Sequence, residues 1–147
     1  MAFRFALAPL LRLRQSIERQ RTLELQEANL RVGRARESLA QLERCVAASA
    51  ESSAAGLTAG CTSAELQFAA AVRENMVRFA EELRIKIREL ELARQIALAA
   101  YHLAYREREV LETLRAQQRI VYDKEQSRRE QQQLDEMYLL QHWHHRH

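Results

Sequence analysis

The 147-residue chain has only three Gly and one Pro, too few to form the turns of a multi-stranded sheet. Its apolar fraction of 47% owes much to alanine, so we expect narrow seams between helices instead of a thick core. The net charge of +3 is small, the two signs are interspersed, and no apolar run reaches the about 18 residues of a membrane span, which argues against nucleic-acid binding and a transmembrane segment.

The first 17 residues contain Arg4, Arg12 and Arg14 and no acidic residue. This composition overlaps with that of an organellar transit peptide, and that alternative stays open. The more favoured interpretation is the start of a helix, because Pro9 is tolerated in a first turn, where its missing N–H is not needed. We predict a first helix over about residues 6–55.

A coiled-coil pattern dominates this first helix. Apolar residues recur at alternating steps of three and four, the spacing of a left-handed coiled-coil seam: Leu25, Ala28, Val32, Ala35, Leu39, Leu42 and Val46. Gly33 lies inside the pattern and should destabilise the helix by about 1 kcal/mol relative to alanine.

The only clear break in helical sequence falls at residues 56–61. Gly56 can adopt the left-handed conformation that closes a helix. Thr62 and Glu65 have the spacing of a capping box, which predicts the start of a second helix at about residue 62. Cys45 and Cys61 lie near this turn without a metal-binding spacing, and we interpret them as reduced thiols, although a disulfide at the turn is conceivable.

The second helix is predicted over about residues 62–140, followed by a flexible tail at 141–147 that contains four of the five histidines. Its seam residues are expected to be Met76, Phe79, Leu83, Ile87, Leu90, Ala97, Tyr101, Ala104 and Leu111, with Arg94 and Arg108 interrupting the stripe. A fold-back centred on Thr58 would place Leu39 opposite Val77. Partners from the first helix would then end near residues 111–114, and the second helix would continue alone.

These elements predict an all-α fold: a single coiled-coil rod of two long helices in an antiparallel hairpin, with the second helix overhanging at the open end. The composition changes at Arg115, after which residues 115–136 contain few apolar side chains. An isolated helix of this length is marginal in water, so the overhang is expected either to fray or to bind another protein.

Catalytic and ligand-binding patterns are lacking in the sequence. It contains no phosphate-binding loop, no nucleophile elbow and no Cys/His ligand set, and rods lack the concave pocket that catalysis needs. The histidines of the tail could chelate a metal loosely, but a solvated terminus is the simpler interpretation. We therefore expect no enzymatic activity, no cofactor and no metal.

Two segments resemble the FliJ family of flagellar export proteins. The start, FRFALAPLLRLRQSIE at residues 3–18, is similar to the family's Phe-x-Phe/Leu pair followed by Leu-Leu-x-x-Arg. Tyr122 followed by RREQQQLDE at residues 128–136 resembles its closing signature, and residues 109–115 fit its Leu-Glu-x-Leu pattern. The resemblance covers essentially the whole chain; the alanine-rich tip, Cys61 and the His/Trp tail depart from it.

The resemblance implies a cytoplasmic, non-enzymatic component of the type III export apparatus, similar to the central stalk of rotary ATPases. It implies association with a hexameric export ATPase at the inner face of the inner membrane, contact with the cytoplasmic domain of the export gate, and handling of export chaperones. Membrane association would be peripheral and through partners. No nucleic acid is implied.

Two contact regions are expected on this basis. The open end would enter the ATPase ring through Arg4, Arg12, Arg14, Arg19, Arg21, Arg128, Arg129, Gln132 and Asp135. The hairpin tip would contact the export gate through Leu42, Val46, Val72, Met76 and Phe79, of which Met76 and Phe79 are the strongest candidates. Each residue also has a plainer interpretation, as part of a solvated helix face or of the seam.

Three alternatives remain open from the sequence. The chain could be the stalk protein of a virulence-type secretion system, although the FRF start favours the flagellar branch. It could be a coiled-coil scaffold or homo-oligomeric rod unrelated to export, or a mitochondrial protein.

Overall fold

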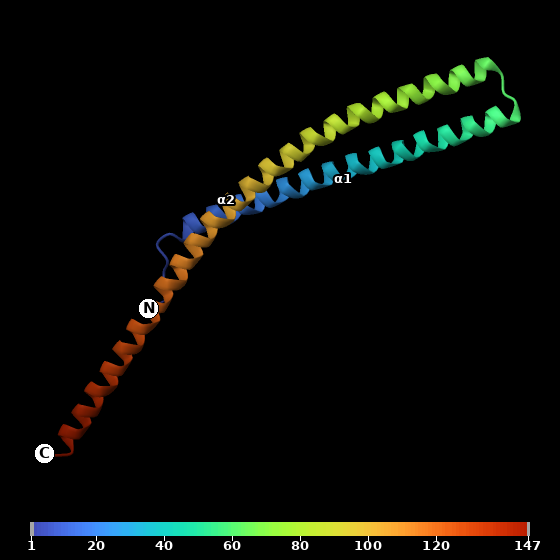
Figure 1. Cartoon of the computed structure of the whole chain (residues 1–147). Helices are drawn as coiled ribbons and strands as arrows, with labels where there is room; N and C mark the ends of the chain where they lie inside the picture. Colours follow the sequence, from blue (N-terminus) through green and yellow to red (C-terminus); the bar gives the residue numbers. More distant parts are fainter. Residues whose placement is uncertain (1, 147) are drawn as a thin grey trace. The chain divides into compact units, whose positions relative to one another are not determined.

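A computed structural model describes residues 2–146 of the chain. Two helices account for nearly all of it: α1 (Ala8–Ala59) and α2 (Ser63–His144), joined by the three residues 60–62 (Figure 1). The predicted all-α fold with two long, mutually packed helices is confirmed. The chain divides into two packing units, residues 20–102 and residues 1–19 together with 103–147, which are described in turn.

The turn differs from the prediction in its position. Residues 56–59 are still helical, and Gly60, with a φ of +81°, terminates α1 in place of Gly56. The predicted capping box is present: the Glu65 N–H donates to Thr62 Oγ1 at 3.3 Å, and the Thr62 N–H donates to Glu65 Oε2 at 3.4 Å. Gly56 does not end α1, because the residues that follow it contain no other signal that stops a helix before the capping box at Thr62.

In the unit formed by residues 20–102, the two helices pack along the predicted seam of α1. Its positions from Leu25 to Val46 are half-buried, and Val32, at 3% exposure, is buried. Within this unit, the buried residues of α2 are Ala80 and Ile87. The prediction for Phe79 as a seam residue is wrong: its side chain is 58% exposed, and Ala80 takes the seam position, because a small side chain allows closer helix approach there.

Ion pairs between the helices show the register of this unit. Arg36 pairs with Glu91, and Arg84 Nη2 lies 3.1 Å from Glu43 Oε1. Leu39 therefore lies between positions 84 and 91 of α2 and not opposite Val77. The predicted register was wrong because it centred the fold-back on Thr58, which is still inside α1.

In the unit formed by residues 1–19 and 103–147, a small apolar cluster joins the chain start to α2. Phe5, Leu11 and Leu111 are each less than 10% exposed, with Phe3, Ala8 and Leu114 packed against them. The Phe3 ring reaches Tyr122, at a centroid distance of 5.5 Å. Partners for α2 therefore extend to Tyr122, beyond the expected limit at 111–114, because a non-helical segment spans more length per residue than a helix.

The last part of α2 is the predicted overhang. Every residue from 127 to 146 is exposed, and the helix continues to His144, past the expected end at residue 140. The expected tail thus begins as helix over 141–144, and His147 lies outside the described residues. Neither helix contains, within residues 2–146, an apolar stretch of the length that a membrane span requires.

Candidate functional site

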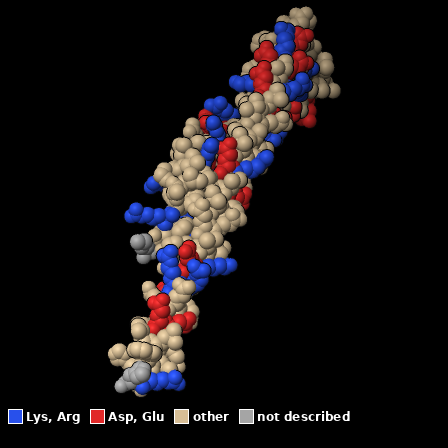
Figure 2. All heavy atoms as spheres, turned by 90° about the vertical axis from the view of Figure 1, so that its left-hand side faces the viewer, with Lys and Arg blue, Asp and Glu red and all other residues tan. Residues whose placement is uncertain are grey.

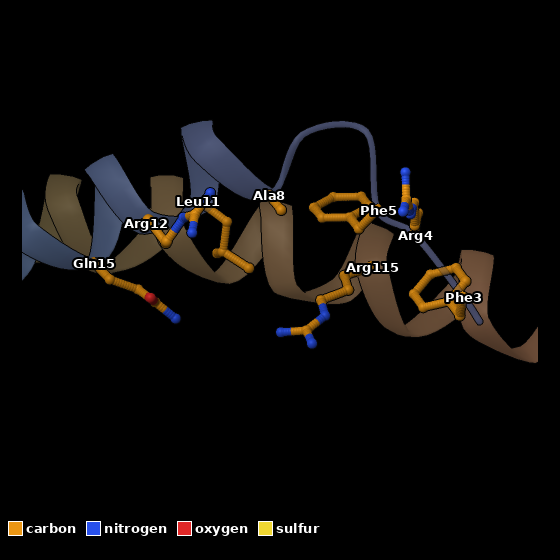
Figure 3. A pocket seen from close by; sticks show the side chains of 8 residues that line it. All are labelled: Phe3, Arg4, Phe5, Ala8, Leu11, Arg12, Gln15 and Arg115. Carbon is orange, nitrogen blue, oxygen red and sulfur yellow. The ribbon is translucent and has the colours of Figure 1, made fainter.

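A pocket with a cationic rim lies at the chain start, where the non-helical N-terminal segment meets α1 and α2 (Figure 3). Its volume is about 450 Å³. Its lining comes from the first segment, from α1 and from α2: Phe3, Arg4, Phe5, Ala8, Leu11, Arg12, Gln15 and Arg115. The floor is aromatic and aliphatic, while three arginines and one amide provide hydrogen-bond donors.

The local sequence explains how this pocket forms. The Ala8 N–H donates to the Phe5 carbonyl at 3.1 Å, a turn that brings the Phe5 ring back against the first turn of the helix. Phe5 then packs in the same cluster as Leu11 and Leu111, which fixes the floor. Arg4 and Arg12, being exposed, remain at the rim.

No acidic residue lines the pocket. Arg4, Arg12 and Arg115 have no ion-pair partner within residues 2–146, so their guanidinium groups are free to bind an external anion. A guanidinium presents a planar fork of donors that matches a carboxylate. The pocket can therefore bind an acidic group next to an apolar side chain.

Next to the pocket, an ion-pair network holds α1 against α2. Arg108 pairs with Glu18 across the helices, and its Nη1 donates to Glu112 Oε2 at 2.6 Å. Burial opposes the charge on Arg108, but the hydrogen bonds and charges of Glu18 and Glu112 outweigh it and raise the pKa of Arg108. Arg14 pairs with Glu107 in the same way. The arginines of this network are thus already paired with carboxylates of the chain, unlike those that line the pocket.

The predicted ring-contact residues thus fall into different environments. Arg4 and Arg12 both line the pocket, whereas Arg14 pairs with Glu107 and Arg21 with Glu24 at 2.9 Å. Arg19 is exposed. The sequence reasoning missed Arg115 as a lining residue; the signal was its position in α2 just after Leu114, where the correct register brings the chain start alongside.

On the overhang, the predicted polar residues are all exposed. Arg129 pairs with Glu125 one turn earlier at 3.2 Å, and Gln131 donates to Asp135 at 3.1 Å, while Arg128 and Gln132 have no partner among residues 2–146. An exposed apolar group follows, each member more than half exposed: Leu134, Met137, Tyr138, Leu139, Leu140 and Trp143. These side chains point in all directions around the helix, which suits an enclosing partner better than a one-sided groove.

At the other end of the hairpin, the tip residues separate into two kinds. Leu42, Val46, Val72 and Met76 are half-buried in the seam, and Phe79 projects into solvent. No group of three or more metal-ligating side chains occurs within residues 2–146. Cys45 and Cys61 are both free. Figure 2 shows cationic and anionic side chains interspersed on the visible face, without a continuous basic band.

The comparison with known families decides the identity. Residues 3–147 match the family described as Flagellar FliJ protein, so the match covers essentially the whole chain. The chain belongs to the FliJ family. Membership makes it a component of the flagellar export apparatus. No curated protein and no solved structure matches the chain.

Proposed function

We propose that this FliJ-family chain is a non-enzymatic, cytoplasmic stalk of the flagellar export apparatus whose open end binds inside the ring of the hexameric export ATPase. The observation that carries the proposal is that a cationic pocket without an acidic lining residue occurs together with a long helical segment whose residues 127–146 are all exposed. Both lie in the same packing unit.

The pocket and the overhang offer complementary kinds of contact. Arg4, Arg12 and Arg115 would bind acidic loops of the ring, and the apolar group from Leu134 to Trp143 would lie against its inner wall. Arg128 and Gln132, which are exposed and unpartnered within residues 2–146, would supply exchangeable polar contacts. A thin helix that is apolar around its circumference gains most by being surrounded.

The remaining contacts follow from the same assignment. The hairpin tip would bind the cytoplasmic domain of the export gate through Phe79 and the neighbouring half-buried residues, linking the ATPase to the gate at the inner face of the membrane. Export chaperones are the third class of partner. The match to the FliJ family supports this assignment over a virulence-type stalk or a scaffold unrelated to export.

The test is a charge reversal on the overhang. The Arg128→Glu/Arg129→Glu double variant should lose capture of the export ATPase in a pull-down, because it reverses the charge of two proposed ring contacts. Within the chain, the change removes only one exposed pair, that of Arg129 with Glu125. Such a pair contributes about 0.5 kcal/mol or less, so the fold should be retained. Circular dichroism checks the helical content.

The matched control reverses two arginines of α1 that have no ion-pair partner within residues 2–146. The Arg34→Glu/Arg44→Glu variant carries the same change in net charge and should capture the ATPase as well as the wild type does. If the overhang variant also binds as the wild type does, the ring assignment is wrong. A second pair, Arg12→Glu/Arg115→Glu, asks the same of the pocket.

A further inference from the structure

A second coiled-coil seam runs along the outer face of α2. Eight positions follow one another at alternating steps of four and three, the spacing of a heptad seam: Ile85, Glu89, Leu92, Ile96, Ala99, Leu103, Arg106 and Val110. We call these residues the outer seam. The five large apolar members are 55–72% exposed: Ile85, Leu92, Ile96, Leu103 and Val110.

This stripe is separate from the face that packs on α1. Ile87, at 9% exposure, belongs to the inner seam, and Ile85 lies two residues earlier, rotated by about 200° around the helix. Because α2 is one uninterrupted helix through these positions, helical geometry alone places the eight residues on one face. An apolar face with a 3.5-residue period is the pattern of a helix that packs on another helix.

The order of residues along the outer seam is its own complement. Read from the two ends inward, Ile85 corresponds to Val110, Glu89 to Arg106, Leu92 to Leu103 and Ile96 to Ala99. In an antiparallel pair of identical helices related by a two-fold axis, these are the residues that face each other. The only two charged positions of the seam therefore meet as opposite charges, once on each side of the axis.

The flanking residues agree with the same register. Lys86 would lie across from the second copy's Glu107, which also pairs with Arg14 of its own chain, and Arg88 from the second copy's Glu109, which also accepts from Tyr105 of its own chain. Opposite charges beside an antiparallel seam favour this alignment over shifted ones. Lys86, Arg88, Glu89 and Arg106 have no ion-pair partner among residues 2–146, so they are available for it.

A surface groove lies at one end of the outer seam. It has a volume of about 490 Å³ and is lined by Arg106, Glu109, Val110 and Thr113, together with Leu114 and Gln117. The first four are spaced i, i+3, i+4 and i+7, the four residues that form a hole for one side chain of a facing helix. In the two-fold arrangement, the side chain above this hole is the second copy's Ile85.

From these observations we propose that the chain self-associates as an antiparallel dimer through the outer seam of α2, with Glu89 of each copy paired to Arg106 of the other. The proposal does not depend on the role in export. It commits to a second copy because the seam is complementary to itself in both apolar and charged positions.

Sedimentation equilibrium with charge variants tests the proposal. At about 100 µM the wild type should approach twice its 17.2 kDa monomer mass, in a concentration-dependent manner. The Glu89→Arg and Arg106→Glu variants should each dimerise at least about ten-fold more weakly, since like charges face each other twice. An equal mixture of the two variants should recover the wild-type dimer, because each contact then joins opposite charges.

The Glu37→Arg variant is the matched control, because Glu37 is exposed on α1 and has no ion-pair partner within residues 2–146. It should dimerise like the wild type. A wild type that stays monomeric, or a variant mixture that stays as weak as its components, overturns the proposal. Either result would leave the outer seam to a helix of a different protein.

Cysteine cross-linking fixes the orientation independently. In a background with Cys45→Ser and Cys61→Ser, chains carrying Leu92→Cys are mixed with chains carrying Leu103→Cys and oxidised with glutathione disulfide. Disulfide-linked dimers should form in the mixture and not from either chain alone. Linked dimers from Leu92→Cys alone would show a parallel arrangement and contradict the proposed one.

Discussion

Replacing Arg108 should destabilise the hairpin more than replacing any other paired arginine of the chain. Arg108 occupies a seam position of α2, and its side chain is only 18% exposed. Its partner Glu18 is 17% exposed, and Glu112 is 43% exposed. Gln15 also donates to Glu112, at 3.4 Å, and the guanidinium lies 5.1 Å from the Tyr105 ring centre.

The magnitude follows from what the Arg108→Ala variant leaves behind. The Glu18 carboxylate would remain largely covered and would lose the charge of Arg108, and breaking one partner of a fully buried pair costs about 3–5 kcal/mol. Because Glu112 can turn to solvent and the seam is thin, we expect a loss of about 2–3 kcal/mol in the free energy of unfolding. The raised pKa of Arg108 agrees in sign, since the carboxylates favour its charged form.

The assay is urea unfolding followed by far-UV circular dichroism. Arg129→Ala is the control, because its pair with Glu125 is 60% and 50% exposed and should contribute at most about 0.5 kcal/mol. The Arg108→Leu/Glu18→Leu double variant should recover most of the loss, because it removes both charges and fills the seam. Equal effects of Arg108→Ala and Arg129→Ala would refute the reasoning.

Two further predictions concern the backbone and the tip. In the same urea assay, Gly33→Ala should raise the free energy of unfolding by about 0.5–1 kcal/mol, because alanine favours the helix and its Cβ would meet nothing within 4 Å. Gly60→Ala should lower it by about 1 kcal/mol, because φ at this position is +81°. Effects of the same sign would contradict this prediction. Met76→Ala should destabilise by about 1–2 kcal/mol, while Phe79→Ala should change stability by less than about 0.5 kcal/mol and weaken capture of the export gate. If Phe79→Ala binds the gate normally, the tip assignment fails.

The helical hairpin could be predicted because its determinants are local. The capping box at Thr62 and the seam of α1 from Leu25 to Val46 depend only on spacing within a single helix, and both are present. The helix end was misplaced because Gly56 and Gly60 offer the same conformational freedom. The capping box at Thr62 decides between the two glycines, because the turn must lie immediately before it, and Gly60 is the nearer one.

Contacts between the helices were harder to predict because each depends on the register. A fold-back centred a few residues too early placed the wrong residues opposite each other. It made Arg108 look like an interruption of the seam, when Glu18 lies across from it. The pocket was not predicted: Arg4 and Arg12 were named only as ring contacts, and Arg115 lines the pocket with them because the chain start lies alongside α2.

The seam between α1 and α2 has a consequence for how the chain tolerates changes in length. No residue among 2–146 is fully enclosed, and the buried ones are spread along both units, so each stretch is stabilised chiefly by its immediate neighbours. Deleting one heptad from each helix at facing positions near the turn would keep every remaining seam residue in phase. Deleting one or two residues would rotate everything beyond the cut onto a different face. The length of the two helices can therefore change in steps of seven residues without a new fold.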